Sequence, residues 1–64
     1  MPAIKELIEQ ATIVVVDGTS YRVHYCEADC FIAEDEENGD TVSIYYEEID
    51  LKRDSIFKLT LLNP

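Results

Sequence analysis

The chain has 64 residues, with 14 Asp and Glu against 5 Lys and Arg, and its formal net charge is -9. A chain of this length forms one small domain, because it cannot divide its buried surface between two cores. Hydrophobic residues make up 47% of it, which excludes the class of disordered acidic tails. The excess of acids disfavours nucleic acid or an anionic membrane as a direct partner, because both are bound through Lys and Arg. It favours a basic partner or a metal ion.

The longest apolar run, Ile13–Val16, is far shorter than the roughly 18 residues of a membrane span. The first residues include an acid, Glu6, and do not form the apolar stretch of a signal peptide. We therefore expect a soluble cytoplasmic protein with no membrane partner. In that compartment Cys26 and Cys30 are expected to be reduced thiols rather than a structural disulfide.

Residues 2–11 are predicted to form an amphipathic helix. Pro2 suits its first turn, and apolar residues recur at the spacing of one helical face, namely Ile4, Leu7, Ile8 and Ala11. A helix of this length is not stable alone. We therefore expect its apolar face to cover a β-sheet formed by residues 12–62.

Five strands are predicted in that region. The first, over residues 12–16, is β-branched and ends in Asp17-Gly18, a strong signal for a two-residue hairpin. The others are expected over residues 19–26, 30–33, 41–46 and 55–62, with a turn at 27–29, a charged loop at 34–40 and a connector at 47–54. Alternation predicts an inward face made of Tyr21, Val23, Tyr25, Val42, Ile44, Tyr46, Phe57, Leu59 and Leu61.

A helix followed by five short strands is typical of a small barrel, which limits exposed sheet edges. The pattern resembles the Sm-like family and other SH3-like barrels, and residues 13–23 and 42–49 carry the resemblance. It implies an α+β, mostly β fold in which an N-terminal helix packs on a five-stranded antiparallel SH3-like or Sm-like sheet. RNA-binding members of the family carry basic residues where this chain has Tyr46-Glu47-Glu48. The resemblance thus implies the fold without RNA binding.

The acidic residues are concentrated between Arg22 and Lys52, where no Lys or Arg intervenes. That stretch contains 10 of the 14 acids, so the rest of the chain is nearly neutral. If the third and fourth strands form a hairpin, their acidic ends are expected to lie near each other as one negative surface. Because Tyr is enriched at binding hot spots, we predict a partner-binding site with Tyr45 as anchor. Its acidic members are Glu34, Asp35, Glu36, Glu37, Asp40, Glu47 and Glu48.

Three interpretations of this surface stay open. It could be a solvated coat that keeps a small protein soluble. It could instead be a decoy whose carboxylates occupy the phosphate sites of a basic groove. In size and charge the chain resembles small acidic phage-encoded inhibitors of the DNA-mimic, anti-CRISPR or anti-restriction type, which implies an inhibitor of a nucleic-acid-binding enzyme or complex in the host cytoplasm. The alternative function is an Sm-like or SH3-like oligomeric structural or adaptor protein, with Ile56 and Leu62 as apolar contacts.

Enzyme motifs are absent from the sequence, and we expect neither catalytic residues nor cofactors. Gly18 and Gly39 are explained as turn residues and do not form a phosphate-binding loop. Residues 35–40 lack the alternating ligands and distal Glu of a calcium loop.

The residues His24, Cys26 and Cys30 lack the second ligand pair of a zinc knuckle, so we expect no metal site. A three-ligand site, a Cys26–Cys30 disulfide and simple packing thiols stay as alternatives. Glu27 and Asp29 would raise the pKa of a neighbouring thiol, which is opposite to what a nucleophile needs.

Overall fold

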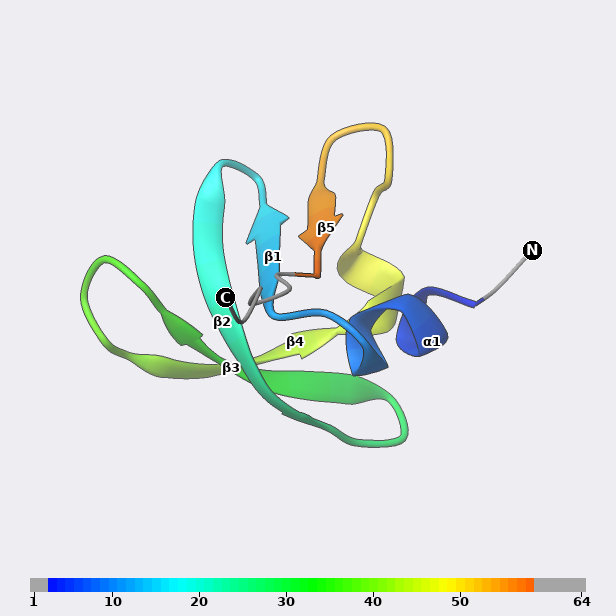
Figure 1. Ribbon diagram of the computed structural model, residues 1–64, viewed down its shortest axis with the longest axis horizontal. Coiled ribbons are helices and arrows are strands. Elements are labelled where there is room, and N and C mark those ends of the chain that lie inside the picture. The colour runs from blue at the N-terminus through cyan, green and yellow to red at the C-terminus, as the bar shows by residue number, and fades with distance from the viewer. Residues whose placement is uncertain (1–2, 59–64) are drawn as a thin grey trace, which may run out of the picture.

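The computed structural model describes residues 3–58, which form one open antiparallel sheet with a short helix. In chain order the elements are α1 (Ile4–Glu9), β1 (Ile13–Val16), β2 (Thr19–Cys26), β3 (Cys30–Asp35), β4 (Thr41–Tyr45), the 3-10 helix η1 (Tyr46–Glu48) and β5 (Ser55–Phe57). The strand order is β4-β3-β2-β1-β5 (Figure 1), so the short last strand lies beside the first. The predicted α+β, mostly β fold is confirmed.

The predicted hairpin between β1 and β2 is confirmed. Its two-residue loop has positive φ at both positions, 50° at Asp17 and 84° at Gly18, and Val16 pairs with Thr19 directly across it. Positive φ at both central residues is characteristic of the tight turn whose twist matches that of the flanking strands. Asp and Gly are the residues that tolerate this backbone.

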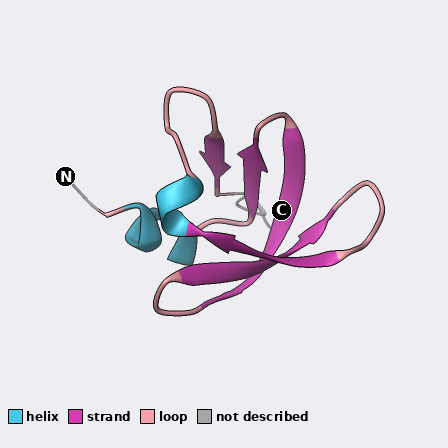
Figure 2. Cartoon of the chain, turned by 180° about the vertical axis from the view of Figure 1, so that it is seen from behind, coloured by secondary structure: helices cyan, strands magenta, loops and turns pink. Residues whose placement is uncertain are grey.

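The core lies between α1 and the sheet. Its fully buried side chains are Ile8 of α1, Val14 of β1 and Phe31 and Ala33 of β3, joined by Ile44 and Ile49. The helix is shorter than predicted, since it ends at Glu9 with Gln10 as its C-cap, and Pro2 lies outside the described residues. Figure 2 shows α1 and η1 at the same end of the sheet. Within residues 3–58, neither helix has the length and apolar character needed to cross a bilayer.

A β-bulge changes which side chains of β2 face the core. Val23 pairs with Ala33, but Tyr25 pairs with Ile32, so His24 is an extra residue in β2. Because an extra residue shifts the alternation by one, Tyr25 is 56% exposed and Cys26 packs against the core. The prediction that Tyr25 faces inward is wrong for this reason.

The faces of β5 are also the reverse of those predicted. Val14 pairs with Ile56, and residues directly opposite in a sheet share a face, so Ile56 packs against the core. Phe57 is 47% exposed and pairs with Ile13 on the outer face. The predicted contacts of Leu59, Leu61 and Leu62 lie outside the described residues.

Candidate partner-binding surface

The β3–β4 hairpin separates the predicted acidic site into two groups. The loop group lies at one end and consists of Glu34, Asp35, Glu36, Glu37 and Asp40. Tyr45, the last residue of β4, and Glu47 and Glu48 of η1 lie at the other end (Figure 1). The five residues of β4 span about 15 Å at the rise of a β-strand. The expectation of a single continuous acidic surface at the hairpin ends is therefore corrected to two acidic groups on opposite ends of one hairpin.

In the loop group, Asp35 has a structural role. Its Oδ1 accepts hydrogen bonds from the backbone N–H of Glu37 at 2.8 Å and of Asn38 at 3.4 Å. The Asn38 side-chain oxygen accepts a further bond from the N–H of Asp40 at 2.9 Å. Such local side-chain bonds stabilise turns, so Asp35 serves the loop's own conformation.

Two further acids of the loop group are paired across the sheet. The Arg22 guanidinium donates to Glu36 at 3.1 Å, and His24 Nε2 lies 3.3 Å from Glu34. Exposed pairs of this kind contribute less than about 1 kcal/mol to stability. Arg22 nevertheless places a positive charge beside Glu36 and reduces the local negative charge there. Glu37 and Asp40 stay exposed at the tip of the loop.

The second group is organised by η1, which packs on the β2–β3 turn. Glu48 reaches back and accepts a hydrogen bond from the backbone N–H of Tyr45 at 3.1 Å, as in a capping box. The Tyr46 N–H donates to the carbonyl of Asp29 at 3.2 Å, and the Tyr46 hydroxyl donates to the carbonyl of Glu27 at 2.7 Å. The two Tyr46 bonds fix η1 relative to the turn, while the Glu48 bond stabilises the start of η1, so Glu48 is also a structural residue.

Tyr46 joins this end of the hairpin to the core. Its ring stacks on buried Phe31 with a centroid distance of 6.0 Å and an interplanar angle of 24°. Burial raises the pKa of the Tyr46 hydroxyl, and the neighbouring Cys26 thiol adds to the increase. Tyr46 is therefore a neutral phenol whose ring stacks on Phe31 and whose hydroxyl donates to Glu27. This agrees with the predicted inward orientation of Tyr46.

A hollow opens beside this anchored segment. Its lining residues are Ala28, Asp29, Tyr45, Tyr46 and Glu47, and we refer to it as the Tyr45 hollow. The Tyr45 side chain is 51% exposed, as predicted from the alternation of β4. Within residues 3–58, no Lys, Arg or His side chain lies within ion-pair distance of Asp29 or Glu47.

Comparison with known proteins gives a uniform result. No protein-family model, curated protein or solved structure matches this chain. The Tyr45 hollow differs from the loop group in one respect that bears on binding, because its acidic residues adjoin an exposed aromatic residue.

The cysteines lie at the β2–β3 turn as two free thiols. Cys30 Sγ donates to Glu27 Oε1 at 3.6 Å. Partial burial raises the pKa of the Cys30 thiol, and the Glu27 and Asp29 carboxylates raise it further. In the described part of the chain, His, Cys, Asp and Glu form no group of three or more that could hold a metal ion. The bulge turns His24 toward Glu34 and away from Cys26.

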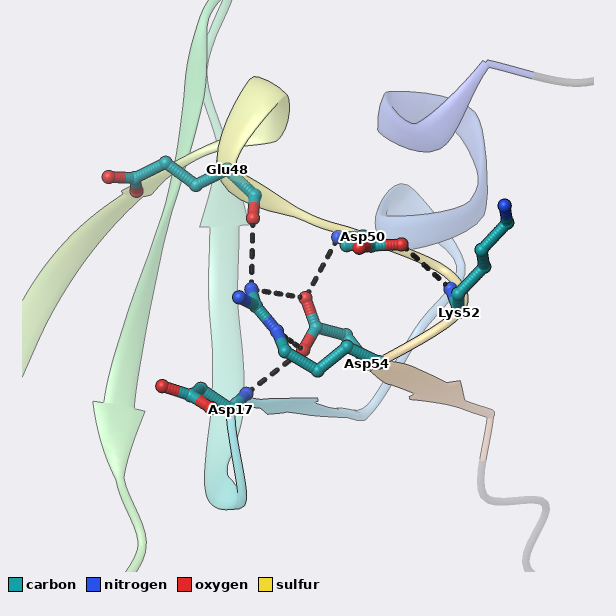
Figure 3. A network of polar contacts seen from close by, with 6 residues as sticks. Asp17, Glu48, Asp50, Lys52 and Asp54 are labelled. Carbon is teal, nitrogen blue, oxygen red and sulfur yellow. Dashed lines mark hydrogen bonds and ion pairs between the residues drawn. The ribbon is translucent and has the colours of Figure 1, made fainter.

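One acidic site was not predicted from the sequence. Asp54, just before β5, is buried, and its carboxylate accepts hydrogen bonds from the backbone N–H of Asp17 and of Asp50, both at 2.9 Å (Figure 3). Arg53 donates to the same carboxylate through Nε at 2.7 Å and Nη2 at 3.0 Å, and also to the Glu48 carbonyl. The local sequence Asp50–Asp54 suggests only an exposed turn, because the partner Asp17 lies 37 residues away.

Proposed function

We propose that this protein is a non-enzymatic binding protein that docks the Tyr45 hollow on a basic surface of a partner. The observation that carries the proposal is an exposed Tyr45 ring next to two carboxylates, Asp29 and Glu47, that have no basic partner within residues 3–58. Tyr is a frequent hot-spot residue, and surrounding polar groups can exclude water from it.

The partner class follows from the charge. With a net charge of -9, the protein is attracted to surfaces that evolved to bind phosphates, and this attraction increases the association rate at low salt. We therefore propose that the protein inhibits a nucleic-acid-binding enzyme or complex by occupying its basic groove. Glu37 and Asp40, at the far end of the hairpin, would add to the long-range field, while Glu36 is partly compensated by Arg22.

We further infer that the five-stranded sheet belongs to the SH3-like or Sm-like type of small β fold. Three features support this type: β1 lies between β2 and β5, η1 separates β4 from β5, and a bulge at His24 interrupts the long strand β2. Bulges bend and twist strands, which a small barrel requires.

A second function, an oligomeric structural or adaptor protein, is favoured by one observation. Within residues 3–58, β4 and β5 are the two edges of the sheet and each pairs with one strand only. Unpaired edges are sites where another chain can add a strand. Sedimentation velocity separates the two proposals, because a stable ring supports the oligomer and a monomer supports the docking protein.

The docking proposal is tested by capturing partners from a lysate of the source cells at about 50 mM and about 500 mM salt. Wild type is compared with Tyr45→Ala, Glu47→Lys and the matched control Glu37→Lys, which makes the same change in net charge at the other end of the hairpin. We expect wild type to capture a nucleic-acid-binding protein, and we expect high salt or added duplex or single-stranded nucleic acid to release it. Tyr45→Ala and Glu47→Lys should lose it while Glu37→Lys retains most of it. Capture that is indifferent to both Tyr45→Ala and Glu47→Lys would refute the proposal.

A further inference from the structure

We propose that the Tyr45 hollow receives an arginine side chain of the partner, with the guanidinium stacked on the Tyr45 ring and bonded to the carboxylates of Asp29 and Glu47. This inference rests on the proposed function, because it specifies the chemistry of the partner group that the same surface would bind. Three properties of the hollow carry it: a fixed frame, uncommitted carboxylates and an exposed ring beside a small residue.

The frame of the hollow is fixed before any ligand arrives. One wall is the β2–β3 turn, and the other is η1, which is bonded to that turn through the Tyr46 N–H and hydroxyl. Behind them the stacked Tyr46 and Phe31 rings connect the hollow to the core. A preformed site loses less conformational entropy on binding than a mobile loop would.

The carboxylates of the hollow are not used by the fold. Many acids of this chain accept hydrogen bonds from their own domain, as Asp35, Glu48, Asp50 and Asp54 accept backbone N–H groups. Asp29 contributes only its carbonyl, to the Tyr46 N–H, and Glu47 has no side-chain partner within residues 3–58. Both residues are exposed and line the same hollow, so their carboxylates are available to accept hydrogen bonds from a ligand.

The shape favours arginine over lysine. A guanidinium is planar, so it can lie flat on an aromatic ring while its N–H groups extend sideways toward carboxylates. A lysine ammonium is a compact, strongly hydrated charge that gains less from such stacking. Ala28, which also lines the hollow, has only a methyl side chain and adds little bulk to the lining.

The test is an amide NMR titration of the full chain with three capped tripeptides: Gly-Arg-Gly, Gly-Lys-Gly and Gly-citrulline-Gly. Citrulline has nearly the shape of arginine without its charge. We expect the arginine peptide to shift the amides of residues 28–29 and 45–47, the lysine peptide to bind several-fold more weakly, and the citrulline peptide to leave these signals in place. Equal shifts by arginine and lysine peptides, or shifts spread evenly over all acidic segments, would overturn the inference.

Substitutions in the Tyr45 hollow test whether the arginine peptide binds there. We expect Tyr45→Ala to weaken binding of the arginine peptide about 2- to 5-fold, the range of an exposed cation–π contact. Tyr45→Phe should bind the peptide with unchanged affinity. Ala28→Leu, in an exposed turn, should fill the hollow and abolish the shifts while the remaining amide spectrum stays folded. Glu37→Lys is the charge control and should change the affinity less than Glu47→Lys does. Unchanged binding in both Tyr45→Ala and Ala28→Leu would overturn the assignment.

The inference and the proposed function fail separately. If partner capture requires Tyr45 but the hollow shows no preference for the arginine peptide over the lysine peptide, the arginine assignment is overturned and the docking proposal is retained. Arginine-specific shifts at the hollow, together with partner capture that is unaffected by both Tyr45→Ala and Glu47→Lys, support the arginine site and overturn the docking proposal.

Discussion

The buried carboxylate of Asp54 accepts a hydrogen bond from the backbone N–H of Asp17 at 2.9 Å, and this bond joins the segment before β5 to the tip of the β1–β2 hairpin. Asp17 has a positive φ and donates its N–H sideways out of the tight turn. The same carboxylate is shared with Arg53 and with the N–H of Asp50. One side chain thus connects two turns that are far apart in the sequence.

Replacing Asp54 with Asn should destabilise the protein by about 2–3 kcal/mol, because charge-assisted hydrogen bonds to a buried carboxylate are lost. The measurement is urea unfolding at neutral pH. Asp50→Asn is the matched control, since Asp50 is exposed and its carboxylate accepts, among residues 3–58, only the Lys52 N–H. Its cost should stay below about 1 kcal/mol. Equal effects of the two substitutions would contradict a special role for Asp54.

The contribution of Asp54 to the free energy of unfolding should decrease in acid. The Arg53 guanidinium and the N–H groups of Asp50 and Asp17 hold the pKa of the Asp54 carboxyl well below its ordinary value, despite burial, which acts in the opposite direction. Because the folded-state pKa is lower than the unfolded one, the stabilisation is complete above the ordinary Asp pKa of about 3.9 and is lost as pH falls below it.

This pH dependence is measured as the difference in unfolding free energy between wild type and Asp54→Asn, from neutral pH down to about pH 2. The other carboxylates titrate in both proteins, so the difference isolates Asp54. We expect the gap to narrow steadily below about pH 4. A gap that is constant over the whole range would show that Asp54 acts by shape and not by charge.

Gly18→Ala should destabilise the β1–β2 hairpin by about 1–2 kcal/mol, the cost of a left-handed backbone for a residue with a Cβ. A Cβ at Gly18 would meet no atom within 4 Å, so the expected cost comes from φ at +84° and not from a clash. Thermal unfolding measures it. Asp17→Asn is the control and should be nearly neutral, because Asn tolerates positive φ. A neutral Gly18→Ala would mean that the turn relaxes to another form.

Tyr46→Phe should cost about 1 kcal/mol, because it removes the hydroxyl that donates to the Glu27 carbonyl at 2.7 Å and leaves the ring stacked on Phe31. Tyr45→Phe, one residue earlier, should change stability by less than about 0.5 kcal/mol, since Tyr45 is half exposed. Chemical denaturation of both variants checks this pair. Similar costs for the two would be inconsistent with Tyr46 as the residue that anchors η1.

The local parts of the fold could be predicted from the sequence. β-branched residues, the Asp17-Gly18 turn and the helical spacing of Ile4 and Ile8 each act over a few residues, and the corresponding elements are present. The faces of β2 beyond His24 could not be predicted, because a bulge is defined by pairing with β3 and has no signal in β2 itself. The same holds for β5, whose three residues take their orientation from β1.

The candidate site was predicted in part. Tyr45 is exposed and Glu47 lies beside it, as expected from alternation. Asp29 was missed as a site residue, because its proximity to Tyr45 arises only when β3 brings the β2–β3 turn to the end of β4. Charge density along the chain also overestimated the negative charge of the loop group, because it does not show that Arg22 reaches Glu36 from the neighbouring strand.

The position of β5 determines the order in which the sheet can assemble. β1 to β4 are consecutive hairpins closed by short turns, whereas β5 pairs with β1 only after the whole chain between them has folded back. Closing that long loop costs more chain entropy than closing any hairpin, and three residue pairs repay little of it. β5 should therefore dock last and detach first. The amides of Thr12 and Asp17, bonded to Phe57 and Asp54, would report this opening as faster hydrogen exchange than that of the β2–β3 pairs.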